Sequence, residues 1–166
     1  MISATAPDQF AELIRINFPA EPLPRAFWVG GTAQPDGDIP NELEKPLAHR
    51  RWTDVTMRDW TVIGPARIAK LYLHPDAFRY YLPSLLVGVL DDIGYLDWAL
   101  ECLLPAGRKR RIDRAEWTDF WNGLSGEQRE AIRSYLKGAR WMLGDSIDPS
   151  NQQLFDELEA IWGGLR

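Results

Sequence analysis

The sequence has few of the residues from which catalytic and metal sites are usually built. Its 166 residues include one cysteine, Cys102, and two histidines, His49 and His74. A single cysteine forms no disulfide within the chain, so nothing points to an oxidising compartment. Cys102 lies in an apolar stretch far from either histidine, and we interpret it as a buried thiol rather than a nucleophile. The histidines lack metal-ligand spacing, so we predict neither a metal nor a cofactor.

Long apolar runs and targeting signals are also missing. The longest apolar stretch, residues 82–90, is nine residues long and contains Pro83 and Ser84, whereas a membrane-spanning helix needs about 20 apolar residues. The first residues lack the basic region and apolar core of a secretory signal. We therefore expect a cytoplasmic protein that does not associate with membranes.

The chain carries no excess of positive charge and no nucleotide-binding or serine-hydrolase motif. Its formal net charge is −5, which argues against a nucleic-acid partner because phosphate contacts need a basic surface. The pair Gly30-Gly31 lacks the glycine spacing of a phosphate-binding loop. No Gly-x-Ser-x-Gly sequence occurs. An acidic chain of this kind suits a basic protein partner.

Apolar and aromatic residues are plentiful instead. Hydrophobic residues make up 45% of the chain, which suits a globular domain with a substantial core. Eight tryptophans are many for this length, and we expect most to fill the core or its rim. They are Trp28, Trp52, Trp60, Trp98, Trp117, Trp121, Trp141 and Trp162.

The pattern predicts a mainly α protein, a compact single-domain helical bundle spanning residues 1–166. Residues 1–18 are expected to form an N-terminal helix, residues 19–40 an irregular arm rich in proline, and residues 41–166 the helical body. The clearest amphipathic helix begins after Ser125, which has capping-box spacing with Gln128. A minor strand pair within residues 52–73 is the open alternative to helical turns there.

A central helix over about residues 75–91 organises the predicted bundle. Pro75 suits its first position, and the apolar second half requires burial on several sides. Pro83 lies inside it and predicts a kink or a break near Leu82. Asp91 and Asp92 follow at its end. They are either an acid–base pair or, in the interpretation that we favour, a solvated corner.

Charge is unevenly distributed along the chain. Arg108, Lys109, Arg110 and Arg111 form a basic run that either docks an acidic partner or is a solvated loop. The last quarter is rich in acidic residues: Asp145, Asp148, Asp156, Glu157 and Glu159. This polarity is typical of proteins that recognise other proteins or themselves.

One block resembles a family of small bacterial proteins of unknown function. Residues 73–83, Leu-His-Pro-Asp-Ala-Phe-Arg-Tyr-Tyr-Leu-Pro, are similar to its Leu-x-Pro-x-Ala-(Phe/Leu)-Arg-Tyr-Tyr-Leu-Pro sequence. A later Phe-x-x-Leu-(Ser/Thr)-x-x-Gln sequence is similar to residues 120–128, with one extra residue before Leu124. A preceding tryptophan, Trp52 or Trp60, is shared too. The likeness covers about residues 50–143 and resembles toxin-associated immunity proteins, which implies a small helical binding partner without catalytic residues.

These observations predict a non-enzymatic, protein-binding module, an immunity protein that neutralises a toxin by occluding it. The expected partner-binding residues are Phe27, Trp28, Asp91, Asp92 and the basic run, Arg108, Lys109, Arg110 and Arg111. One alternative is a small enzyme or ligand-binding domain whose pocket lies at the Pro83 kink. That pocket would use Arg79, Tyr80, Tyr81, Asp91 and Asp92. A second alternative is a structural subunit of a larger assembly; the sequence leaves the oligomeric state open.

Overall fold

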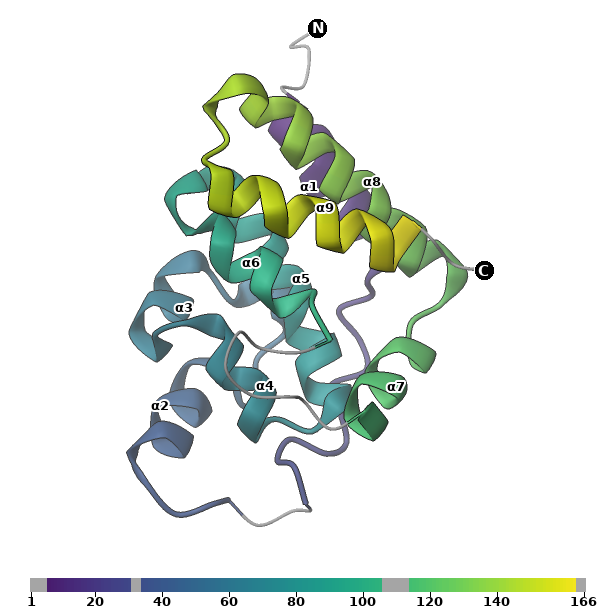
Figure 1. Ribbon diagram of the computed structural model, residues 1–166. Coiled ribbons are helices and arrows are strands. Elements are labelled where there is room, and N and C mark those ends of the chain that lie inside the picture. The colour runs from purple at the N-terminus through teal and green to yellow at the C-terminus, as the bar shows by residue number, and fades with distance from the viewer. Residues whose placement is uncertain (1–5, 31–33, 106–113, 164–166) are drawn as a thin grey trace, which may run out of the picture.

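One helix, α5 (Pro75–Asp91), runs through the middle of the protein and touches most of the others. In this computed structural model, which describes residues 6–30, 34–105 and 114–163, α5 packs against five helices. They are α1 (Ala6–Asn17), α3 (Met57–Ile63), α4 (Ala69–Tyr72), α6 (Leu96–Cys102) and α7 (Arg114–Asn122). Figure 1 shows α8 (Gly126–Leu143) and α9 (Pro149–Gly163) across one end, and α2 (Asp38–Leu47) beside α3 at the other. The predicted mainly α fold is confirmed.

The α5 sequence explains both its start and its position. His74 precedes it and accepts a hydrogen bond at Nδ1 from the Asp76 amide, 3.2 Å away, and Pro75 occupies the first turn. From Tyr81 to Leu90 every residue except Val87 is buried. The helix is continuous through Pro83, so a break at Leu82 is wrong. The neighbours packed around Pro83 hold the helix together where its own hydrogen bond is missing.

Residues 52–73 form short helical turns and no strand pair. Trp52–Asp54 is a 3₁₀ turn, α3 follows, then the 3₁₀ turn Ala66–Ile68, and α4 ends at Tyr72. A capping box joins Thr56 and Asp59 and starts α3, and Gly64, at φ +96°, ends it. Leu73 alone takes part in β pairing, an isolated antiparallel bridge to Trp28. The alternative of a strand pair is therefore wrong.

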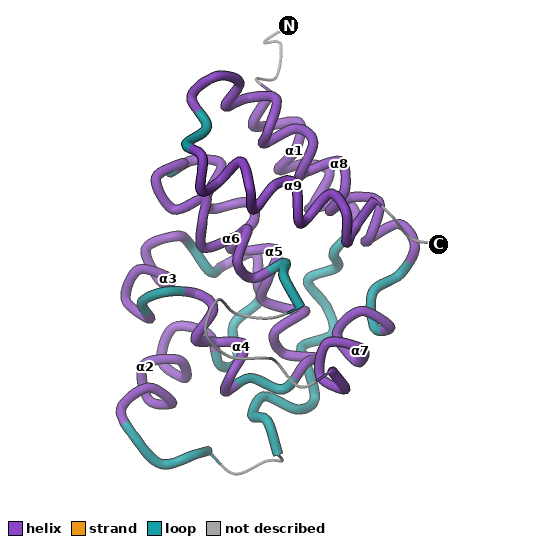
Figure 2. The backbone as a smooth tube through the Cα atoms, in the orientation of Figure 1, coloured by secondary structure: helices purple, strands orange, loops and turns teal. Residues whose placement is uncertain are grey.

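The irregular arm lies against the helical body. Its described residues, 18–30 and 34–37, lie between the end of α1 and Asp38, where α2 begins, so the arm is slightly shorter than predicted (Figure 2). Near its start, Trp52 Nε1 donates to the Phe18 carbonyl over 3.1 Å and the Tyr80 hydroxyl to the Ala20 carbonyl over 2.6 Å. Farther along, Val29 N donates to Tyr72 O over 2.8 Å and His74 N to Phe27 O over 2.9 Å. These contacts fasten the first part of the arm, from Phe18 to Val29, to the helical body.

The terminal helices form a layer of their own. The capping box at Ser125 and Gln128 starts α8, as predicted, and α8 packs against α1 on one side and α9 on the other. Gly138 provides room for the Phe10 ring, because a Cβ at Gly138 would lie 2.1 Å from that ring. Arg140 of α8 pairs with Asp156 at 2.7 Å and Glu159 at 2.9 Å. Part of the acidic C-terminal quarter is thus neutralised within the fold.

Most tryptophans lie in the core or on its rim, as predicted. Trp28, Trp52, Trp60 and Trp162 are buried, and Trp98, Trp117 and Trp121 are partly buried against the core. Trp141 differs, because 74% of it is exposed. Among the described residues, no helix is both long and apolar enough to cross a membrane.

The buried hydrogen bond between Trp60 and Ser84 yields a stability prediction. Trp60 is fully buried and its Nε1 donates to Ser84 Oγ over 2.9 Å. Ser84→Ala leaves that donor without an acceptor and should lower the free energy of unfolding by about 1–3 kcal/mol, measured by urea denaturation. In a Trp60→Phe background the same substitution should cost clearly less. Ser146→Ala, at an exposed position, is the control; equal costs in both backgrounds would contradict this account.

Candidate functional site

A cavity of about 310 Å³ lies where the arm crosses the end of α2. We call it the arm cavity. Its lining comes from arm residues 23–28 and Gln34, from Glu44, Ala48 and His49 at the end of α2, and from Tyr81 of α5. Three segments far apart in the sequence meet here, and pockets of this kind are common small-molecule sites.

Aromatic rings form the inner wall of the arm cavity. The Phe27 ring packs edge-on against Trp28, with centroids 4.6 Å apart, and against Tyr81 at 6.2 Å. Trp28 is 5% exposed, which corrects its prediction as an exposed partner-binding residue. The bridge to Leu73 draws the arm inward at this point and turns the Trp28 side chain into the core. Phe27 is partly buried and still borders the cavity.

The residues predicted to form a pocket at Pro83 do not come together. The Arg79 guanidinium donates to the Asp119 and Phe120 carbonyls at the end of α7 over 3.1 and 3.3 Å. The Tyr80 hydroxyl donates to Ala20 O and accepts a hydrogen bond from the Trp52 amide. These polar groups hold other elements in place.

Asp91 and Asp92 lie exposed at the opposite end of α5. Their solvated-corner interpretation fits this exposure, and their inclusion in a pocket with Arg79 and Tyr80 is wrong. Tyr81 does border a cavity, but on the arm side of α5, where Pro83 takes no part.

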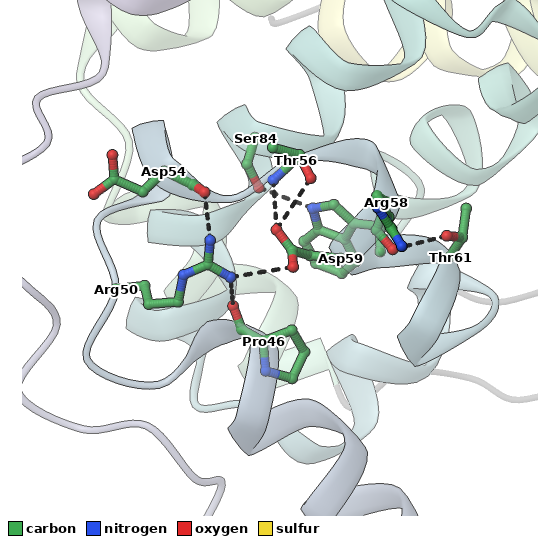
Figure 3. A network of polar contacts seen from close by, with 9 residues as sticks. Pro46, Arg50, Asp54, Thr56, Arg58, Asp59, Thr61 and Ser84 are labelled. Carbon is green, nitrogen blue, oxygen red and sulfur yellow. Dashed lines mark hydrogen bonds and ion pairs between the residues drawn. The ribbon is translucent and has the colours of Figure 1, made fainter.

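His49 has a backbone conformation that non-glycine residues seldom adopt, with φ of +63°. The next residue holds this turn in place (Figure 3). Arg50 donates from Nη1 to Pro46 O over 2.7 Å and from Nη2 to Asp54 O over 2.5 Å. Its Nη1 also pairs with Asp59 Oδ1 at 3.2 Å. One guanidinium thus joins the end of α2, the following 3₁₀ turn and α3, and fixes the edge of the cavity that carries His49.

Hydrogen bonds and burial shift the pKa values of Asp59 and Tyr81, which both contact Arg50. Burial opposes ionisation of Asp59, but the Thr56 amide and the Arg50 guanidinium outweigh it and hold the Asp59 pKa below its ordinary value. The Tyr81 hydroxyl donates to Arg50 O over 2.9 Å, and burial raises the Tyr81 pKa. Tyr81 therefore stays neutral and offers the cavity its ring rather than a free hydroxyl.

A second titratable pair lies where α4, α6 and α7 meet. Cys102 is fully buried, and burial raises the pKa of its thiol to about 12, which suits a structural thiol rather than a nucleophile. Lys70 Nζ donates to Cys102 O over 2.9 Å and to Leu104 O over 2.5 Å. It also lies 5.5 Å from the Phe78 ring and 5.6 Å from the Trp117 ring. Burial lowers the Lys70 pKa to about 8.

The remaining predicted residues give no further site. Arg108, Lys109, Arg110 and Arg111 lie outside the described residues. Within the described part of the chain, no three histidine, cysteine, aspartate or glutamate side chains gather as metal ligands.

Two strongly exposed apolar side chains lie on one pair of neighbouring helices. Ile16 of α1 is 73% exposed and Trp141 of α8 is 74% exposed, the highest values among the large hydrophobic residues that the structure describes. The two helices pack side by side. They run in opposite directions (Figure 1), so Ile16, near the end of α1, and Trp141, near the end of α8, lie toward opposite ends of the pair. We use the name α1–α8 face for the solvent-exposed sides of these two helices, which carry both side chains. Sequence reasoning missed both residues. The α8 periodicity carries a signal for Trp141, because this residue lies off the apolar stripe that steps through Ala131, Tyr135 and Ala139.

The conformation of His49 gives a prediction about backbone strain. Glycine adopts a positive φ without cost, whereas a residue with a Cβ pays about 1 kcal/mol or more. We expect His49→Gly to exceed His49→Ala in free energy of unfolding by about 1 kcal/mol in urea denaturation. At exposed Lys45, inside α2, the same pair of substitutions should show the reverse order because alanine favours helix. An alanine variant at least as stable as the glycine variant at position 49 would contradict this.

Lys70 gives a prediction about pH. The unfolded chain holds the Lys70 proton up to pH of about 10.4, whereas the folded chain loses it near pH 8. Between these values unfolding takes up a proton, so stability rises with pH. The free energy of unfolding of the wild type, minus that of Lys70→Met, should rise across this window by at most about 3 kcal/mol. The difference between wild type and Lys45→Met, at an exposed site, should stay constant; a flat Lys70 difference would contradict the assignment.

Comparison with known proteins adds no relative to this geometry. No family model, curated protein or solved structure matches the chain. The resemblance of residues 50–143 to immunity-associated proteins therefore stays a prediction.

Proposed function

We propose that this chain is a non-enzymatic protein-binding module that recognises its partner through the α1–α8 face. The observation that carries the proposal is the exposure of Trp141, together with Ile16, on two helices that are packed firmly together. Tryptophan is the residue type most enriched among side chains that dominate binding energy at interfaces. A large ring held in water on a rigid helix gains most when a partner covers it.

Packing and ion pairs hold α1 and α8 in place within the fold. Phe10 packs over Gly138, and Arg140 joins α8 to α9 through Asp156 and Glu159. Little conformational freedom is therefore lost when a partner binds, which favours affinity. The net charge of −5 favours a partner of opposite charge and speeds their encounter.

The partner class comes from the sequence resemblance. We propose a toxin encoded beside this chain, neutralised when the chain covers its active surface. Asp91, Asp92 and Phe27 remain candidates for additional contacts, since all three reach the surface at least in part. A cytoplasmic location is part of the same proposal.

The test is binding of the purified chain to the product of its neighbouring gene, measured by calorimetry. Trp141→Ala and Ile16→Ala should each weaken the complex by about tenfold or more, equivalent to about 1.4 kcal/mol. Val62→Ala, which truncates a side chain of α3 that is 60% exposed, is the matched control and should leave affinity unchanged.

Two outcomes would overturn the proposal. The absence of a complex would remove the toxin partner. A complex that tolerates both substitutions would remove the α1–α8 face. Light scattering of the chain alone distinguishes a third case, because a structural subunit would assemble with itself and Trp141→Ala would dissociate that assembly.

A further inference from the structure

The arm cavity has the size of a small-molecule site and opens to solvent on the side of Arg25, Glu44 and His49, which are exposed. Its volume of about 310 Å³ falls at the lower end of the range for ligand pockets, which begins at about 300 Å³. The side chains at its base, Trp28 and Tyr81, are buried and held by the bridge to Leu73 and by the hydrogen bond to Arg50. The cavity is therefore formed before any ligand arrives.

Three charged or polar side chains of the lining have no partner. Among the described residues, Arg25, Glu44 and His49 make no side-chain hydrogen bond and no ion pair. Charged neighbours close in sequence are engaged, since Arg50 binds Pro46, Asp54 and Asp59, and Arg51 pairs with Glu21 at 3.1 Å. The groups that border the cavity are thus available to a ligand.

The signs of these charges restrict the ligand. Arg25 belongs to the arm and Glu44 to α2, so opposite charges come from different walls. A purely anionic ligand would meet the Glu44 carboxylate, and a purely cationic one would meet the Arg25 guanidinium. A molecule that carries one charge of each sign satisfies both. Its apolar part would lie against Phe27, and the His49 imidazole can add a hydrogen bond as donor or acceptor.

We propose that the arm cavity binds a small zwitterion with an apolar body, of the size and chemistry of an aromatic α-amino acid. Arg25 binds the carboxylate, for which a guanidinium is well shaped. Glu44 binds the ammonium group. Phe27 contacts the ring of the ligand. This site is separate from the α1–α8 face and does not depend on the function proposed for it.

Three probes of nearly equal shape test the proposal on the unmodified chain. L-Phenylalanine carries both charges, 3-phenylpropanoate lacks the ammonium group and 2-phenylethylamine lacks the carboxylate. We expect saturable binding of L-phenylalanine at millimolar concentration in amide NMR titrations, with shifts at Phe27, Ala48 and His49. Each singly charged probe should bind about tenfold more weakly, because it loses one charge-assisted contact.

Substitutions then assign each contact. Arg25→Gln should remove the preference for L-phenylalanine over 2-phenylethylamine, and Glu44→Gln the preference over 3-phenylpropanoate. Glu42→Gln, at an exposed position of α2 outside the cavity, should change neither. Equal affinity for all three probes would overturn the zwitterion assignment. No saturable binding of any probe, or shifts that fall away from the cavity, would overturn the site.

Discussion

The structure depends on the burial of α5 from Tyr81 to Leu90. A helix without a polar face must be covered on every side, because each exposed apolar side chain forfeits about 1.5–3 kcal/mol of burial energy. The coverage comes from α1, α3, α6 and α7, and from the turns at either end of α5. Polar groups on α5 are satisfied one at a time, as in Ser84 with Trp60 and Tyr81 with Arg50. The remaining helices are arranged around this requirement.

The arm cavity lies on the side of α5 that the arm covers. The arm cannot continue as a helix through Pro19, Pro22 and Pro24, so it follows an irregular path against the body. Its described residues are fastened to the body by hydrogen bonds near Phe18 and Ala20, by the ion pair of Glu21 with Arg51, and by hydrogen bonds beside Leu73. A space bordered by Phe27, Glu44 and His49 remains between the arm and the end of α2.

Much of the fold could be predicted from local signals. Three local signals predicted helices that the structure contains: the capping-box spacing of Ser125 and Gln128, the proline at the start of α5, and the amphipathic periodicity of α8. Tertiary packing did not override these local preferences. The strand pair in residues 52–73 failed because a short apolar run has the same pattern in a strand and in a buried helical turn. Leu73 joins the arm in an isolated bridge, a long-range contact that no local pattern encodes.

The sites were harder to predict than the fold. Trp28 is predicted as a contact residue because it is aromatic. Whether its side chain faces the core, however, depends on its bridge to Leu73, a residue distant in the sequence. Tyr80 and Tyr81 are adjacent in the sequence, yet their hydroxyls bind elements far apart, at Ala20 and Arg50. Arg25, Glu44 and His49 belong to separate segments, and their shared cavity exists only once the arm is folded back. The exposure of Trp141, in contrast, could be predicted from the helical periodicity of α8.

The main-chain attachment of the arm has a consequence for how this protein can vary. Hydrogen bonds between Val29 and Tyr72 and between His74 and Phe27 involve backbone atoms, so they persist whatever side chains neighbouring positions carry. Residues 23–25 line the cavity without anchoring the arm. The side chains at Leu23 and Arg25 can therefore change while the path of the chain stays the same, whereas Pro24 helps to set that path. Backbone hydrogen bonds thus fix the path of the arm, while side chains that line the cavity can be substituted. Binding preference can therefore evolve, or be selected from a library, at little cost in stability.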